Sequence, residues 1–100
     1  MKVTKSEIID YLKANKSEFE NKYFIDRFGL FGSYARDEAG EDSDIDISYI
    51  LKEGKKLSYF ELFNLEKKLE KHFDRRVDLI NYRYMNPIVK YKSSKEIIYV

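Results

Sequence analysis

Two different hydrophobic periods in one short chain constrain its fold class. Between residues 45 and 50, apolar and polar residues alternate, which is the period of a strand with one buried face. Between residues 58 and 73, leucines and a phenylalanine recur at spacings of three and four, which indicates a helix with one apolar face. Because that face needs a sheet to cover it, we predict an α/β (α+β) fold.

Length and composition limit the chain further. One hundred residues suit a single domain over residues 1–100, able to bury about two-thirds of its surface. Nineteen Lys and Arg nearly balance eighteen Asp and Glu, giving a net charge of +1, so no overall field attracts a polyanion and nucleic acid is not an expected partner. The absence of cysteine excludes disulfides and cysteine-based metal sites.

The remaining elements follow from caps and turn residues. The spacing of apolar residues predicts a helix over 5–20 and a strand over 27–31 that ends at Gly32-Ser33. A helical turn over 34–37 and a polar loop over 38–43 follow. It further predicts a strand over 76–81 and a short helix starting at Asn86-Pro87. The apolar tail 97–100 suits a strand, a helix end or a contact with a partner equally. We therefore expect a small mixed sheet of about three strands flanked by about four helices.

Three aspartates in separate places form the candidate chemical centre. Asp44 and Asp46 alternate on a strand, so their carboxylates project to one side, about 6.6 Å apart along the backbone. Asp78 is the one charged residue in the apolar run 77–80 of the last predicted strand, where burial is costly unless a cation or polar site receives it. If the first two strands are antiparallel and the 58–73 helix is a right-handed crossover to a parallel third strand, all three acids meet at one edge of the sheet.

The same edge carries groups suited to phosphate. Gly32 lets a phosphate approach the backbone, and Ser33 offers a hydroxyl and an amide. For Arg36, a phosphate contact and a structural salt bridge are both open. Clustered carboxylates favour Mg²⁺, and two such ions bridging carboxylates and a triphosphate assist an in-line displacement. Without metal, the three acids should raise one another's pKa. The competing interpretation is a solvated acidic turn, since Glu38, Glu41 and Asp42 are close in sequence.

These residues form one composite motif: Gly32-Ser33, ten further residues, Asp44-x-Asp46 and a later strand aspartate, Asp78. The motif resembles that of the minimal nucleotidyltransferase family of the polymerase-beta-like superfamily. The Gly-Ser-x-Ala-Arg opening resembles its antitoxin branch, whose members pair with HEPN-domain toxins. The resemblance implies the nucleotidyltransferase fold and Mg²⁺-dependent transfer of AMP from ATP to a hydroxyl, a tyrosine of the cognate toxin, with which the chain would form a hetero-oligomer.

The resemblance also implies roles for individual residues. Asp44, Asp46 and Asp78 would be the catalytic metal ligands, with Asp78 also the base. Gly32 and Ser33 would bind the nucleotide phosphates, and Arg36 matches the same motif.

Two other functions compete with this hypothesis. The same fold can act as a binding module that neutralises a partner by occlusion, with no AMP transfer. It can also act on RNA or a small molecule, which the near-zero charge disfavours. Tyrosines interleave with Lys and Arg over residues 82–99, which favours a protein interface over base stacking. No apolar run approaches the roughly 18 residues of a membrane span, so we expect a cytoplasmic protein without membrane contact.

Overall fold

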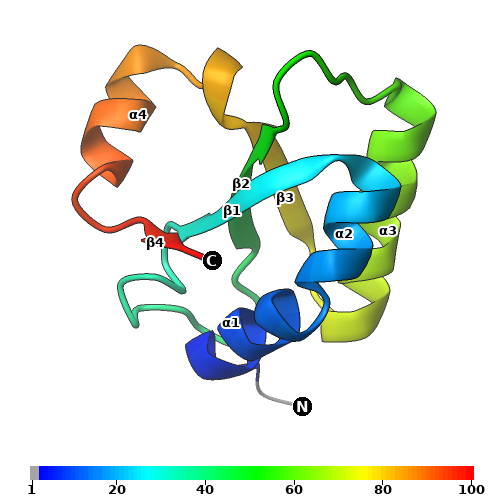
Figure 1. Cartoon of the computed structure of the whole chain (residues 1–100). Helices are drawn as coiled ribbons and strands as arrows, with labels where there is room; N and C mark the ends of the chain where they lie inside the picture. The colour runs from blue at the N-terminus through cyan, green and yellow to red at the C-terminus, as the bar shows by residue number, and fades with distance from the viewer. Residues whose placement is uncertain (1–2) are drawn as a thin grey trace.

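The computed structural model describes residues 3–100 (Figure 1); most of its elements follow one another closely, and the longest connection, residues 32–44, joins β1 to β2. In chain order they are α1 (Lys5–Ala14), α2 (Lys16–Tyr23), β1 (Ile25–Phe31), β2 (Ile45–Leu51), α3 (Tyr59–Phe73), β3 (Val77–Asn81), the 3-10 turn η1 (Tyr82–Tyr84), α4 (Pro87–Ser93) and β4 (Ile98–Tyr99). The mixed α/β fold class is confirmed.

The strands form one mixed sheet in the order β3-β2-β1-β4. β1 pairs antiparallel with β2, and β2 pairs parallel with β3, which confirms both pairings that the sequence predicts. The tail forms a fourth strand, β4, which pairs antiparallel with β1. The sheet therefore has one strand more than the roughly three expected.

One face of the sheet carries the core. The register sets Phe28 opposite Tyr49 and Leu30 opposite Ile47, so these side chains point to the same side. Ile47 and Leu30 are fully buried there, against α1, α2 and α3. Figure 1 shows α2 and α3 lying together on this side of the sheet. Because helices close this face, the sheet can offer side chains to a ligand only from its opposite face or from its ends.

The opposite face is partly covered by the segment between α4 and β4. A Cβ atom at Gly29 would lie 2.6 Å from Ile97 Cδ1 and 2.7 Å from Ser48 Oγ. Ser48 is buried and donates a hydrogen bond to the Gly29 carbonyl at 3.3 Å. The missing side chain at Gly29 thus lets Ile97 lie directly on β1.

The continuous helix expected over 5–20 is wrong, because the chain breaks at Asn15. Asn15 has φ −106° and ψ 13° and ends α1. Its side-chain amide donates to the Tyr11 carbonyl at 2.9 Å, a local bond that competes with continued helix. α2 then runs on to Tyr23 and ends at Phe24, whose φ of 58° is left-handed.

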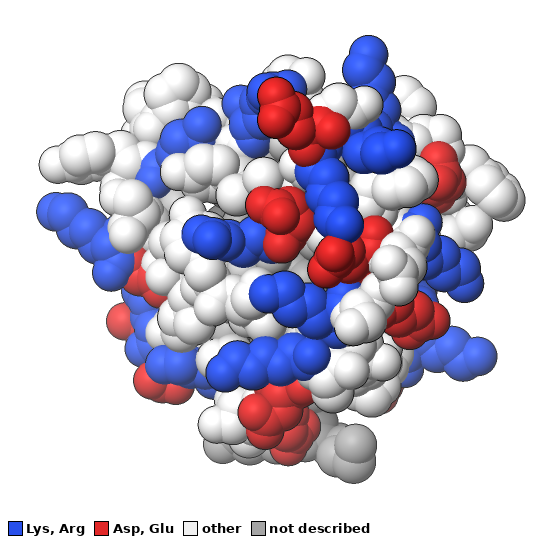
Figure 2. All heavy atoms as spheres, viewed as in Figure 1, with Lys and Arg blue, Asp and Glu red and all other residues white. Residues whose placement is uncertain are grey.

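Opposite charges are interspersed on the molecular surface. On the face shown in Figure 2, Lys and Arg side chains alternate with Asp and Glu, without a broad area of one sign. This agrees with the near-equal counts of the two charges. Among residues 3–100, no helix has the length and apolar character that crossing a bilayer requires.

The crossover helix α3 owes its start to a capping box. The Ser58 hydroxyl accepts a hydrogen bond from the Glu61 amide at 3.1 Å, and the Glu61 carboxylate accepts one from the Ser58 amide at 3.2 Å. We expect Ser58→Ala to lower the free energy of unfolding by about 1 kcal/mol. Chemical denaturation checks this, with Ser17→Ala, at an exposed position inside α2, as the control. An equal loss in both variants would contradict the role of the cap.

Candidate active site

The parallel register of β2 and β3 brings two of the predicted acids together. Asp46 lies directly opposite Asp78, so their side chains share the open face of the sheet. The Ile45 amide donates to the Arg76 carbonyl at 2.8 Å and aligns the starts of both strands. Asp78 is exposed, so it carries no burial cost that a cation or a polar site would have to offset.

Asp46 is the carboxyl group most affected by these surroundings. Burial, and then the negative charges of Asp78 and Asp44, raise the pKa of Asp46 from 3.8 to about 6. Asp44 precedes β2 and is half-buried. The positive charge of Arg36 acts in the opposite direction and lowers the pKa of Asp46. The expected mutual repulsion of the acids is thus confirmed at Asp46.

Gly32 lies against the Asp46 carboxylate. It follows Phe31, which is opposite Asp46 in the register, and it has φ +76°. A Cβ atom at this position would overlap Asp46 Oδ2 and lie 3.0 Å from Asp46 Cγ. Glycine is therefore required both for the left-handed backbone and for the close approach of the carboxylate.

The turn after Gly32 is held by the core. Tyr34 and Ala35 are buried, which leaves Ser33 half-buried and Arg36 exposed at the surface of the turn. The Arg36 amide donates to the Gly32 carbonyl at 3.2 Å, as in a helical turn. The turn ends at Asp37, whose φ is 60°. The helical turn expected here is therefore a single irregular turn, with Ser33 beside Gly32 at its start.

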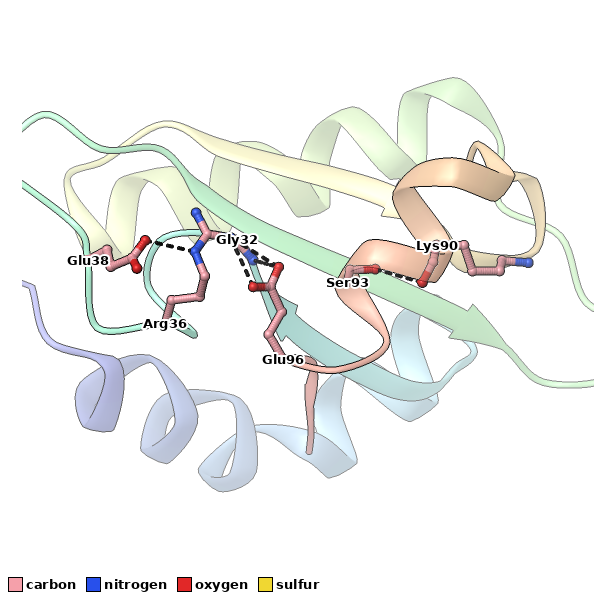
Figure 3. A network of polar contacts seen from close by, with 6 residues as sticks. All are labelled: Gly32, Arg36, Glu38, Lys90, Ser93 and Glu96. Atoms are coloured by element: carbon pink, nitrogen blue, oxygen red, sulfur yellow. Dashed lines mark hydrogen bonds and ion pairs between the residues drawn. The ribbon is translucent and has the colours of Figure 1, made fainter.

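The Arg36 side chain is engaged by two glutamates. Its Nε donates to Glu38 Oε2 at 2.9 Å, and its Nη1 donates to Glu96 Oε2 at 2.9 Å and to Glu96 Oε1 at 3.1 Å. Figure 3 shows the Arg36 guanidinium between these two carboxylates. Glu96 Oε1 also accepts a hydrogen bond from the Gly32 amide at 3.3 Å. Sequence reasoning missed Glu96, which belongs to no motif.

The donor chemistry of the edge suits a hard cation. Asp44, Asp46 and Asp78 offer only carboxylate oxygens, which Mg²⁺ prefers. Within the part of the chain that the structure describes, no three acidic or histidine side chains are arranged to enclose a metal ion by themselves. The metal site expected from the sequence therefore stays a prediction.

The elevated pKa of Asp46 predicts a pH-dependent cost in stability. The unfolded chain releases this proton near pH 3.8, while the folded protein holds it to about pH 6, so stability falls as the pH rises between these values. We expect Asp46→Asn to raise the free energy of unfolding by about 1–2 kcal/mol at pH 7, after discounting for partial exposure. The gain should vanish near pH 4. Denaturation at both pH values checks this, and an equal gain at both would contradict it.

Two glycine variants separate the cost of backbone strain at position 32 from the cost of crowding the Asp46 carboxylate. Gly54 has a similar φ, +77°, with nothing within 4 Å of an added Cβ. Gly54→Ala therefore measures backbone strain alone, about 1 kcal/mol. We expect Gly32→Ala to lower the free energy of unfolding by about 1–3 kcal/mol more than that, because it also displaces the Asp46 carboxylate. Equal losses in thermal or chemical denaturation would show that the Asp46 contact is unimportant.

Sequence comparison places the chain among nucleotidyltransferases. The family described as Polymerase beta, Nucleotidyltransferase matches residues 7–100. Protein adenylyltransferase MntA of Thermococcus cleftensis is 36% identical over 98 residues, which cover 98% of this chain and 97% of that protein. A Methanocaldococcus jannaschii protein, provisionally named a protein adenylyltransferase, is 41% identical over 98 residues, which cover 97% of this chain and 98% of that protein.

Solved structures agree with the sequence comparison. One, provisionally described as a minimal nucleotidyltransferase, superposes with a TM-score of 0.76 at 28% identity and covers 96% of this chain and 95% of that chain. A crystal structure of a toxin-antitoxin with AMP-PNP gives a TM-score of 0.70 at 24% identity and covers 97% of this chain and 72% of that chain; at this identity the likeness shows the fold alone. With Asp46 and Asp78 on adjoining strands, Asp44 directly before the first of them and a Gly32-Ser33 turn beside them, this chain belongs to the polymerase beta nucleotidyltransferase family.

Proposed function

We propose that the chain is a protein adenylyltransferase that transfers AMP from ATP, with Mg²⁺, to a tyrosine hydroxyl of a HEPN-domain toxin, and so acts as an antitoxin. One observation carries the proposal: Asp46 lies opposite Asp78 and against Gly32, on the face of the sheet that points away from the core formed with α1, α2 and α3. Two acids beside a glycine turn provide cation binding and phosphate binding in one place.

The acids would hold the metal. Asp44, Asp46 and Asp78 are the oxygen donors of this edge, and waters and substrate phosphates complete the shell of Mg²⁺ in such sites. Bound Mg²⁺ neutralises phosphate charge during the displacement. The pKa of Asp46, raised to about 6, means that the carboxylate is largely ionised at neutral pH. A nearby cation would stabilise this ionised form further.

The other groups position the nucleotide and the acceptor. The Gly32 amide, the Ser33 hydroxyl and the Arg36 guanidinium bind phosphate oxygens. The acceptor oxygen bonds to the α-phosphorus of ATP, the bond from that phosphorus to the bridging oxygen breaks, and pyrophosphate leaves. Asp78, exposed beside Asp46, takes the proton of the hydroxyl.

Relatives support a protein acceptor. The Thermococcus cleftensis protein that matches nearly the whole chain is named a protein adenylyltransferase. A structure with the same fold, at a TM-score of 0.60 and 23% identity, is a tri-AMPylated Shewanella oneidensis HEPN toxin in complex with an MNT antitoxin. The net charge of +1 and the interspersed charges of Figure 2 give no support to an RNA acceptor.

Label transfer tests this function directly. The chain is incubated with Mg²⁺, ATP labelled in the α-phosphate and a HEPN-domain protein from the same genome, chosen first from any that an adjacent reading frame encodes. We expect the toxin to become labelled, and Asp44→Asn to slow transfer at least about 100-fold, because a metal ligand is lost. Asp42→Asn removes the same charge at an exposed position two residues earlier and should transfer normally.

The same assay separates the competing functions. Circular dichroism establishes that both variants are folded. Neutralisation of the toxin without label transfer by the wild-type chain would identify occlusion as its mechanism. Label on RNA but not on the toxin would identify a nucleic-acid acceptor. Normal transfer by Asp44→Asn would show that the acids do not bind a catalytic metal.

A further inference from the structure

We propose that Glu96 competes with the nucleotide for its binding groups: in the free protein its carboxylate occupies the place of a phosphate, and ATP binds by displacing it. This inference rests on the proposed function, which assigns the Gly32 amide and the Arg36 guanidinium to the nucleotide phosphates. It adds a residue from the far end of the chain that lowers the affinity for nucleotide.

The contacts of Glu96 are those expected of a bound anion. Its two oxygens accept from the Gly32 amide at 3.3 Å and from Arg36 Nη1 at 3.1 and 2.9 Å. Figure 3 shows the Glu96 side chain reaching from the segment after α4 into the corner between Gly32 and Arg36. A backbone amide at a glycine turn and an arginine are donors that bind carboxylate and phosphate oxygens alike. One side chain thus satisfies both donors.

Glu38 does not compete in the same way. It accepts from Arg36 Nε at 2.9 Å, on another edge of the guanidinium, and its side chain is 64% exposed. The guanidinium has further N–H groups beyond Nε and Nη1. Glu38 can therefore hold Arg36 in place while a phosphate replaces Glu96, since only Glu96 is bonded to both Gly32 and Arg36.

Displacement of Glu96 leaves the fold intact. The backbone beside it is anchored: the Ile97 amide donates to the Ser93 carbonyl at 2.8 Å, and the Val100 amide donates to the Phe28 carbonyl at 2.9 Å. The Glu96 side chain is 20% exposed and that of Arg36 is 43% exposed, so both border solvent. A rotation of the Glu96 side chain frees the two donors without separating β4 from β1.

Nucleotide binding by purified variants tests the competition. Dissociation constants for ATP with Mg²⁺ are measured by calorimetry for the wild type, Glu96→Gln and Glu96→Ala. We expect binding about three- to tenfold tighter in Glu96→Gln, because a neutral amide competes less well for Arg36, and at least as tight in Glu96→Ala. Glu53→Gln changes the net charge equally at an exposed position beyond the other end of β2 and should leave the constant unchanged.

A double-mutant comparison tests whether Glu96 affects nucleotide binding through Arg36. In an Arg36→Gln background, Glu96→Gln should change the dissociation constant less than twofold, since the shared guanidinium is gone. Thermal unfolding establishes that each variant is folded. Unchanged affinity in both Glu96 variants would overturn the proposal, and weaker binding would show that Glu96 helps to position Arg36 for the nucleotide. No ATP binding by the wild type would instead refute the proposed function itself.

Discussion

The parallel pairing of β2 with β3 is the constraint on which the site depends. It sets Asp46 opposite Asp78, and a hydrogen bond from Ile45 to the Arg76 carbonyl holds the two strand starts level. Like charges are thereby placed side by side on the face away from the core. Burial, and then repulsion from Asp78 and Asp44, raise the pKa of Asp46, and a cation bound there would relieve both effects.

Much of this arrangement could be predicted because it follows from local rules. The alternation over 45–50 specifies a strand and which of its residues face the core. The capped apolar stripe of α3 specifies a crossover helix, and crossovers are right-handed almost without exception. If β3 returns parallel to β2, as the structure shows, these rules bring Asp46 and Asp78 together, which is the condition under which the sequence predicts their convergence.

One error is local: the break at Asn15 is accompanied by a side-chain bond to the Tyr11 carbonyl four residues earlier, in a stretch whose apolar spacing suits a longer helix. The other differences from the prediction concern features that depend on tertiary contacts. β4 has two residues and is defined by its neighbour β1. The exposure of Asp78 depends on which face the helices leave open. Glu96 reaches Arg36 across 60 residues of sequence, in a segment where no pattern marks it.

Gly29 links these distant parts of the chain. Ile97 lies where a side chain at position 29 would project, and the residue before it is Glu96. The Ser48 hydroxyl lies nearly as close to the same point, so a side chain at position 29 displaces both neighbours. In relatives that have alanine at position 29 and retain this C-terminal strand, we expect compensating replacements at positions 48 and 97.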